Sequence, residues 1–373
     1  MHRRQFLVGS LALAPAVAFA QTPPPAFPPV DARSVWLLGD SAPPDPVKTA
    51  ARLAELVQKG KPRDSYLAGG AVTELEQRFA TMLGKEDCAF LPTGTLANHV
   101  AVRILAGEAT RVIVQHESHL YRDESDATQL LSGLNLIDLA PGKAAPSLDE
   151  IKAAVDEAEN GPYPLKVGAI SLESPVRRAK GEMLDPAALQ AIAAYAKGKN
   201  IRLHLDGARL LLAPPSYDIA GTTALFDTVY VSLYKYLDAP FGAVLAGSKA
   251  DIAKARALRH QFGGTIYQAW PCAVLALAAL DDFQARHKAA FATAEQVFAA
   301  LEKAGAAKVA PASNASNIRQ LVLKPKVAEG VFDRMRDAGV RLAKPGPDGA
   351  IDFWVNDTLN RRPVDEYVKL FLG

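Results

Sequence analysis

Asp206 and Lys235 are the residues whose types and positions most directly indicate chemistry. Asp206 closes the apolar run 201–205, and Lys235 follows the next apolar run, 228–233. Such runs predict buried strands, and open α/β sheets bind ligands at the carboxyl ends of their strands. A lysine amine can form a Schiff base with an aldehyde, and a carboxylate can keep a pyridine nitrogen protonated. Pyridoxal phosphate (PLP) needs both groups, so we predict a PLP enzyme with Lys235 as a catalytic residue and Asp206 on the cofactor.

Each of these residues also has a simpler interpretation. A strand-end lysine on its own is usually a solvated charge, and a strand-end aspartate can bind a metal or cap a helix. No second ligand follows Asp206 at metal spacing, and Cys88 and Cys272 form no Cys-x-x-Cys pair, so we expect no metal site. The two cysteines could pair in an oxidising compartment, but their apolar surroundings favour buried free thiols.

Two further segments carry candidate site residues. Gly94 and Thr95 lie in a turn between a predicted strand, 88–91, and a helix that extends to about residue 105. Free backbone N–H groups and the helix dipole favour a phosphate at such a helix start. His119 is a candidate acid or base, with His116 and His99 as alternatives. His204 shares a strand face with Asp206, which predicts a packing or supporting role.

These segments together resemble the threonine aldolase / aromatic amino acid β-eliminating lyase family of fold-type I PLP enzymes. The resemblance covers roughly residues 60 to 275 and implies that His119 stacks on the cofactor ring. It also implies that Gly94 and Thr95 hold the phosphate and that Arg209 contacts the phenolic oxygen, although a surface salt bridge is the alternative for Arg209. The segments that carry it are His204-Leu205-Asp206-Gly207-Ala208-Arg209, Pro92-Thr93-Gly94-Thr95-Leu96-Ala97-Asn98, Glu117-Ser118-His119, 239–247 and 258–264.

The substrate half of the family pattern differs in this chain. The family fixes the substrate carboxylate with arginines, because a guanidinium binds it through two hydrogen bonds. Tyr267 stands at one arginine position, and 351–354 offers no arginine at the other. Arg177 or Arg178 could supply the contact instead, so Tyr267 and Arg177 are our candidate substrate-binding residues. The usual neighbours of the lysine, a serine before it and glycines after it, are also replaced, by Tyr234 and by 236–238.

Alternating strand and helix patterns predict an α/β fold with a mostly parallel sheet covered on both faces. The resemblance specifies it as the PLP-dependent transferase-like fold, type I. We assign 31–278 to an N-terminal arm and the large PLP-binding domain, and 279–373 to a small C-terminal α+β domain. The predicted strands are 88–91, 111–115, 167–172, 201–205, 228–233, 243–246, 317–322 and 351–355. The predicted helices are 47–59, 74–83 after an N-cap at Thr73, 186–197 after an N-cap at Asp185, 273–301, 331–338 and 364–372.

The first residues predict an export signal and not part of the fold. Arg3 and Arg4 precede an apolar stretch that ends at Ala18-Phe19-Ala20, where small residues fit a cleavage site. We predict a twin-arginine signal peptide at 1–20, a proline-rich tether at 21–30 and a periplasmic protein, with a Sec signal or retained anchor as alternatives. Hydrophobic residues make up 49% and the net charge is +2, so we expect neither a nucleic-acid partner nor stable membrane association.

Three functions follow from the retained cofactor half and the altered substrate half. The first is a PLP-dependent lyase that cleaves a β-hydroxy-α-amino acid to glycine and an aldehyde, in a retro-aldol reaction with His119 as a candidate base. The second is β-elimination, racemisation or other amine chemistry, and the third is a PLP-fold binding protein without turnover. The family also implies a homodimer or homotetramer. Neither Gly-x-Ser-x-Gly nor a dinucleotide fingerprint occurs, so a serine hydrolase or NAD enzyme is not expected.

Overall fold

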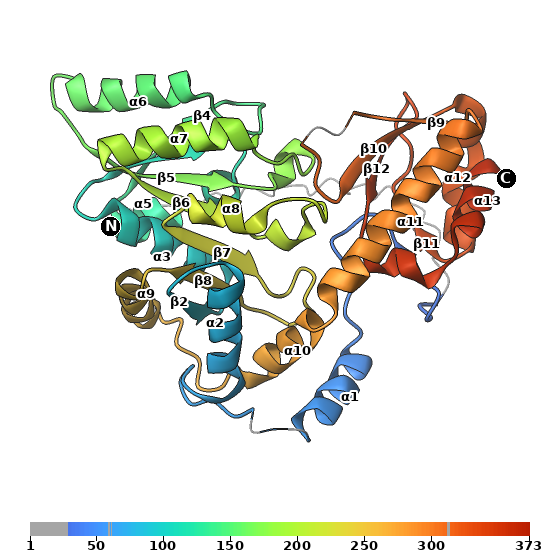
Figure 1. The fold of residues 1–373 in the computed structure, drawn as a ribbon, viewed down its shortest axis with the longest axis horizontal. Helices are drawn as coiled ribbons and strands as arrows, with labels where there is room; N and C mark the ends of the chain where they lie inside the picture. Colours follow the sequence, from blue (N-terminus) through green and yellow to red (C-terminus); the bar gives the residue numbers. More distant parts are fainter. Residues whose placement is uncertain (1–28, 59, 61, 312–313) are drawn as a thin grey trace, which may run out of the picture.

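The computed structural model describes residues 29–58, 60, 62–311 and 314–373. The predicted signal peptide and all but the end of the predicted tether lie outside these residues, so both stay predictions. A larger α/β part contains the central sheet, and a smaller part contains the C-terminus (Figure 1). Across the described ranges, no helix combines the length and the apolar composition that crossing a membrane requires.

The larger part is built on a seven-stranded sheet with the order β2-β8-β7-β6-β5-β3-β4. Strand β8 runs antiparallel to β2 and β7, and the remaining pairs are parallel. All residues of β5, β7 and β8 are buried, as expected for a sheet covered on both faces. The predicted α/β fold is confirmed. The strands are Asp87–Leu91 (β2), Arg111–Gln115 (β3), Asn135–Leu139 (β4), Val167–Glu173 (β5), Arg202–Asp206 (β6), Thr228–Ser232 (β7) and Ala243–Gly247 (β8).

Helices cover the two faces of this sheet with separate apolar cores. Helices α2, α6 and α7 pack on one face, and α3 and α9 on the other (Figure 1). Shorter helices and turns connect these elements. The helices are Gly70–Met82 (α2), Gly94–Ala106 (α3), His119–Arg122 (α4), Ala127–Ser132 (α5), Leu148–Asn160 (α6), Arg177–Ala179 (η1), Pro186–Lys199 (α7), Leu210–Leu212 (η2), Ile219–Ala224 (α8) and Lys249–Gln261 (α9).

Strand β6 shows how the sheet directs its side chains. Leu203 and Leu205 belong to the core under α2, α6 and α7. Because successive side chains on a strand point to opposite faces, His204 and Asp206 point towards α3. The strand therefore carries an apolar side for packing and a polar side for the site.

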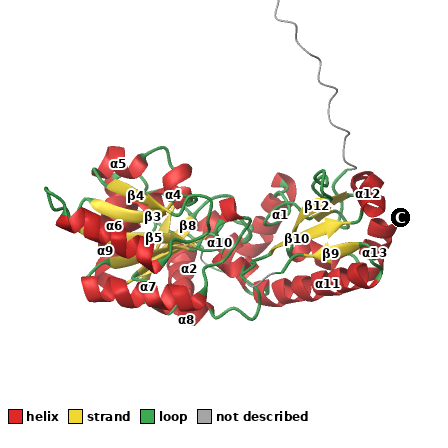
Figure 2. Cartoon of the chain, turned by 90° about the horizontal axis from the view of Figure 1, so that it is seen from above, coloured by secondary structure: helices red, strands yellow, loops and turns green. Residues whose placement is uncertain are grey.

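The smaller part is an antiparallel sheet of order β12-β10-β9 with helices against it. Seen from above, the two sheets lie apart, with α10 between them (Figure 2). The elements after the large sheet are Trp270–Leu280 (α10), Phe283–Lys303 (α11), Ala307–Val309 (β9), Ile318–Leu323 (β10), Pro325–Asp337 (α12), Val340–Arg341 (β11), Ala350–Trp354 (β12), Asp357–Arg361 (η3) and Val364–Leu372 (α13).

The N-terminal arm packs with the smaller part. Its strand β1 (Val35–Trp36) pairs in parallel with β11. Val35 and Leu37 are fully buried in the same core as Phe353 and Tyr367. The arm, which we grouped with the large domain from the sequence, thus contributes its apolar residues to the C-terminal core before α1 (Pro46–Val57) begins.

Some predicted helix boundaries are wrong for local reasons. Helix α2 begins at Gly70 and Thr73 lies inside it, because Gly69 takes a positive φ of 83° that turns the chain into the helix earlier. The predicted single helix 273–301 is two helices, interrupted at Asp281 and Asp282; aspartate favours helix ends over helix interiors. The N-cap at Asp185 is confirmed, since its side chain accepts a hydrogen bond from the Ala188 amide at 2.8 Å.

Replacement of Leu37 by alanine should destabilise the protein, because the cavity left in the C-terminal core cannot be refilled by the short arm. We expect Leu37→Ala to lower the free energy of unfolding by about 2–5 kcal/mol, as buried leucines do. Leu38→Ala is the matched control, since Leu38 is 45% exposed and Leu37 is fully buried. Chemical denaturation of both variants measures the difference, and equal unfolding free energies would contradict the arm's place in this core.

Candidate active site

A cavity of about 270 Å³ lies at the carboxyl ends of β6 and β7 and at the start of α3. Six of the eight predicted site residues line it. They come from one helix start, two strand ends and the short helix α4, far apart in the sequence. These residues are Gly94, Thr95, His119, Asp206, Arg209 and Lys235.

Asp206 is the last residue of β6, and its carboxylate is buried against α3. Its Oδ2 accepts a hydrogen bond from Asn98 Nδ2 at 2.8 Å, and its Oδ1 accepts one from the Ala208 amide at 3.1 Å. A buried carboxylate needs such donors, because it has lost its hydration. The arrangement holds a negative charge ready for a cationic nitrogen in the cavity.

Lys235 follows β7 and reaches the same cavity from the neighbouring strand. Burial lowers the pKa of its ammonium group, and the positive charge of Arg209 lowers it further. Both effects favour the neutral amine, which is the nucleophilic form. The Nζ atom lies 5.3 Å from the centre of the Tyr234 ring. Tyr234, which replaces the serine usual in the family, therefore forms part of the cavity wall.

Arg209 is held by a residue that the sequence analysis did not single out. Its Nε donates to both carboxylate oxygens of Asp40, at 3.0 and 2.9 Å, and both side chains are about nine-tenths buried. The pair is therefore not a surface salt bridge. Asp40 comes from the N-terminal arm, and the contact uses only the Nε edge of the guanidinium.

The start of α3 provides a binding place for an anion. Thr93 is the N-cap, and its Oγ1 accepts a hydrogen bond from the Leu96 amide at 3.1 Å. The N–H groups before Leu96 have no partner within the helix and carry the positive end of its dipole. Gly94 lets the start of α3 lie close to Tyr230, since a Cβ atom at this position would lie 2.1 Å from the Tyr230 hydroxyl.

Of the three candidate histidines, His119 alone lines this cavity. Its Nδ1 lies 2.9 Å from Glu124 Oε1, and this hydrogen bond raises the pKa of the ring against the opposing effect of burial. His116 instead contacts Asp138 at 2.6 Å, and His99 contacts Ser132 at 2.6 Å.

Glu173 is a cavity residue that sequence reasoning missed. It ends β5 directly beside Asp206 in the sheet register. Its carboxylate accepts hydrogen bonds from the His119 amide at 2.7 Å and the Arg177 amide at 2.9 Å. Burial and the charge of Asp206 raise its pKa to about 7. The strand-end position that revealed Asp206 would have revealed Glu173 as well.

The two predicted substrate-binding residues lie outside the cavity lining. Tyr267 is half-exposed and packs edge-on against Tyr66, with 5.2 Å between ring centres. Arg177 donates from Nη2 to Asp123 at 3.0 Å, and Arg178 pairs with the same carboxylate. Arg209 and Lys235 are the cationic side chains among the residues that line this cavity.

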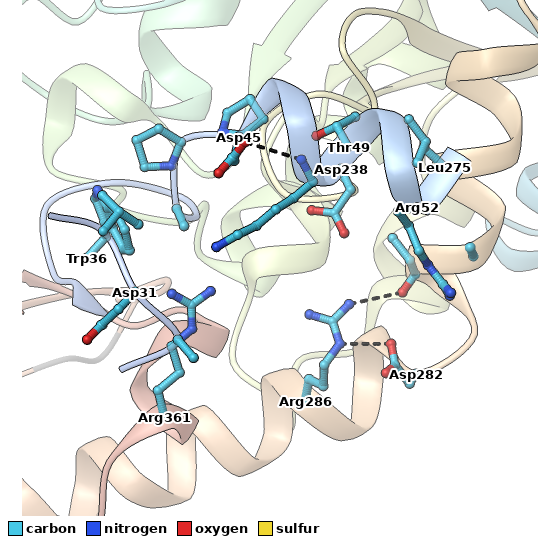
Figure 3. A pocket seen from close by; sticks show the side chains of 18 of the residues that line it. Asp31, Trp36, Asp45, Thr49, Arg52, Asp238, Leu275, Asp282, Arg286 and Arg361 are labelled. Carbon is cyan, nitrogen blue, oxygen red and sulfur yellow. Dashed lines mark hydrogen bonds and ion pairs between the residues drawn. The ribbon is translucent and has the colours of Figure 1, made fainter. Parts of the chain in front are cut away.

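A larger cleft of about 580 Å³ lies between the arm, α1 and α10, and contains none of the predicted site residues (Figure 3). Two arginines that line it already have partners within the molecule. Arg286 donates to Asp282 at 2.8 Å, and Arg361 donates to the Ser34 carbonyl at 2.6 Å. In the described part of the chain, no three His, Cys, Asp or Glu side chains are arranged to hold a metal ion. The smaller cavity is therefore the candidate active site.

The residues of this cavity fit PLP. The start of α3 would hold the phosphate in a place where a Cβ atom at Gly94 would collide with Tyr230. Asp206 would pair with the pyridine nitrogen, Lys235 would hold the aldehyde carbon, and Arg209 and His119 would contact the ring and its oxygen. These donors match the negative phosphate, the cationic nitrogen and the electrophilic aldehyde of the cofactor.

Comparison with known proteins supports the same assignment. The family model of the β-eliminating lyases matches residues 47–323, and the chain belongs to this family of PLP-dependent lyases. The chain is 29% identical over 232 residues to a low-specificity L-threonine aldolase of Arabidopsis thaliana, over 59% of this chain and 64% of the relative. It is 32% identical over 204 residues to an alanine racemase of Cochliobolus carbonum, over 52% of this chain and 50% of the racemase.

The fold comparison covers more of the chain than the sequence comparisons. A crystal structure of a Listeria monocytogenes protein assigned as an L-allo-threonine aldolase superposes with a TM-score of 0.76 and 25% identity. It covers 91% of this chain and 96% of that protein. The expected fold-type I architecture is therefore shared over nearly the whole molecule, whereas the matched sequence spans only about half to two thirds of these two relatives.

Gly94→Ala should weaken PLP binding, because the added Cβ meets the Tyr230 hydroxyl and displaces the start of α3. We expect a loss of affinity of about tenfold or more, equivalent to about 1.4 kcal/mol. Gly198→Ala in α7 is the matched control, since its Cβ would meet no atom within 4 Å. Titration of the cofactor-free proteins with PLP, followed by absorbance, measures both affinities. Equal affinities would contradict the assignment of the phosphate to this turn.

Proposed function

We propose that this chain is a PLP-dependent lyase that cleaves a β-hydroxy-α-amino acid to glycine and an aldehyde. The observation that carries the proposal is the convergence of Lys235, Asp206, Arg209, His119 and the start of α3 on one cavity. Membership of the β-eliminating lyase family and similarity to threonine aldolases support it.

Each residue has a separate task in this proposal. When bound, PLP supplies an electron sink that stabilises the charge left at Cα after a bond breaks. Asp206 keeps a proton on the pyridine nitrogen, and Lys235 provides the neutral amine. The Nε2 atom of His119 accepts the proton of the substrate β-hydroxyl, so that the Cα–Cβ bond can break to release an aldehyde.

Racemisation is a second candidate, because a specific similarity favours it. The alanine racemase of Cochliobolus carbonum is 32% identical over its matched region. A racemase moves the Cα proton and leaves the Cα–Cβ bond intact. The altered substrate half also allows β-elimination or other amine chemistry. The group that anchors the substrate carboxylate would decide which bond at the substrate Cα is broken, and this anchor differs from the family pattern.

We further propose that the protein is exported to the periplasm and works as a homodimer or homotetramer. The export proposal rests on the twin arginines Arg3 and Arg4 before an apolar stretch. The assembly proposal is supported by the exposed aromatic side chains of Tyr66, Tyr234 and Tyr267, of which Tyr234 belongs to the cavity wall. Exposed aromatic side chains are typical of surfaces that are covered on association.

Lys235→Ala should abolish the covalent attachment of PLP while leaving the fold intact. We expect the wild-type protein with added PLP to show a visible absorption band that borohydride removes, and the variant to lack it. Lys254→Ala, an exposed lysine on α9, is the matched control and should keep the band. The absence of such a band in the wild-type protein would overturn the proposed enzyme and leave the non-catalytic binding protein as the remaining function.

The substrate screen separates the candidate reactions. Incubation of the wild-type holoenzyme with threonine, allo-threonine and other β-hydroxy amino acids should release glycine and an aldehyde. Loss of optical rotation of alanine without glycine release would favour racemisation, and release of ammonia and a keto acid would favour β-elimination. Either of the last two outcomes, without glycine release, contradicts the retro-aldol proposal.

A further inference from the structure

Glu124 lies between α4 and α5 and is almost completely buried, with its Oε1 atom shared by two donors. Oε1 is 2.9 Å from His119 Nδ1 and accepts a hydrogen bond from Asn98 Nδ2, also at 2.9 Å. The other oxygen, Oε2, is buried without a hydrogen-bond partner among the described residues. Glu124 is not among the site residues predicted from the sequence, and the family resemblance gives it no role.

We propose that Glu124 is a positioning residue that, together with Asn98, holds the His119 ring with Nδ1 turned inward and Nε2 left for the cavity. The inference concerns the same site as the proposed function and rests on it for the use made of Nε2.

The orientation of the Asn98 amide follows from its neighbours. Its Nδ2 lies within hydrogen-bond distance of two carboxylates, Glu124 at 2.9 Å and Asp206 at 2.8 Å. Only the NH₂ group can satisfy both, because an oxygen there would face two acceptors. The amide oxygen must therefore face His204, whose Nε2 lies 3.0 Å away.

His204 completes this chain of hydrogen bonds as a neutral ring. Burial lowers its pKa to about 4, so it carries no charge near neutral pH. Its Nε2–H donates to Asn98, and its Nδ1 accepts from the Thr228 hydroxyl at 2.9 Å. His204 thus supports Asn98, as expected from its place on the same strand face as Asp206, because its hydrogen bond fixes the orientation of the Asn98 amide.

The tautomer of His119 follows from Glu124 in the same way. A carboxylate oxygen that already accepts from Asn98 can still accept a second N–H, so the ring proton sits on Nδ1. Nε2 then carries a free lone pair when the ring is neutral, and it carries the acidic proton when the ring is charged. One ring atom can therefore take a proton from the substrate and return it later in the cycle.

Several charged groups face His119 and set its protonation. Glu124 and Asp206 raise the pKa of the ring, and Lys235 lowers it. Glu173 accepts a hydrogen bond from the backbone amide of His119, and the charge of Asp123 also interacts with His119. The direct hydrogen bond from the ring to Glu124 is the largest of these effects, so removal of the Glu124 charge should act on His119 first.

The experiment is an NMR titration of the cofactor-free protein labelled with ¹⁵N in its histidine rings. The chain has seven histidines, and loss of one signal set in His119→Gln assigns the ring. We expect wild-type His119 to carry its proton on Nδ1 and to titrate above the usual histidine pKa. In Glu124→Gln the pKa of His119 should fall below its wild-type value, and Glu124→Asp should restore part of the difference.

Glu117→Gln is the matched control, because Glu117 is two residues from His119 but contacts the Gly142 amide at 3.0 Å and not the ring. The control should leave the His119 titration unchanged. If Glu124→Gln does not fold, the wild-type spectrum still decides: a proton on Nε2 overturns the proposal. A folded Glu124→Gln variant with an unchanged His119 pKa also overturns it.

Activity gives a second and separate readout. With any amino acid that the holoenzyme converts, Glu124→Gln should lower kcat about tenfold or more and change KM less than about twofold. It should also shift the acidic limb of the plot of kcat against pH. An equal loss at every pH would contradict a role through His119. If no substrate is converted, the proposed function fails, while the ring titration still tests the positioning role of Glu124.

Discussion

The burial of a negative charge at the end of β6 is the constraint on which the rest of the site depends. An unpaired buried carboxylate is strongly unfavourable. Because Asp206 has lost its hydration, the protein itself must supply its hydrogen-bond donors. The chain supplies them from α3, through Asn98, and from the turn after β6, through the Ala208 amide. Helix α3 must therefore pack on this face of the sheet, and its start then forms the anion site.

The same region holds more negative than positive charge. Asp206, Glu173 and Glu124 are buried close to one another, and Arg209 is already paired with Asp40. Burial, and after it the like charge of Asp206, raise the pKa of Glu173 to about 7. The site thus favours ligands with a cationic group and retains protons near neutral pH.

The sequence predicted the residues at strand ends better than the residues between elements. Asp206 and Lys235 follow apolar runs, so their place at one edge of the sheet could be predicted, and Glu173 offered the same unused signal. Asn98 and Glu124 gave no such signal, because a buried amide or carboxylate within a helix or loop has no characteristic spacing. Their contacts join α3, the α4–α5 connection and β6, which only the folded chain brings together.

The secondary structure shows a related division. Helix α6 was missed although its capping box, Ser147 with Glu150, is a local signal of a helix start. The break between α10 and α11 at Asp281 and Asp282 was also visible in principle. The pairing of β1 with β11 was not, since two-residue strands lack a period and their partners lie at opposite ends of the chain.

The N-terminal arm links the two parts of the molecule at the site itself. Val35 and Leu37 anchor it in the C-terminal core, while Asp40 holds Arg209 and the Ser41 hydroxyl donates to the Lys235 carbonyl at 2.9 Å. A shift of the smaller part would have to move the arm or break these contacts. The contact with Asp40 uses the Nε atom of Arg209, so the terminal nitrogens of the guanidinium take no part in this hydrogen bond. The arm therefore supports Arg209 and Lys235, whereas β6 and α3 position Asp206 and the candidate anion site.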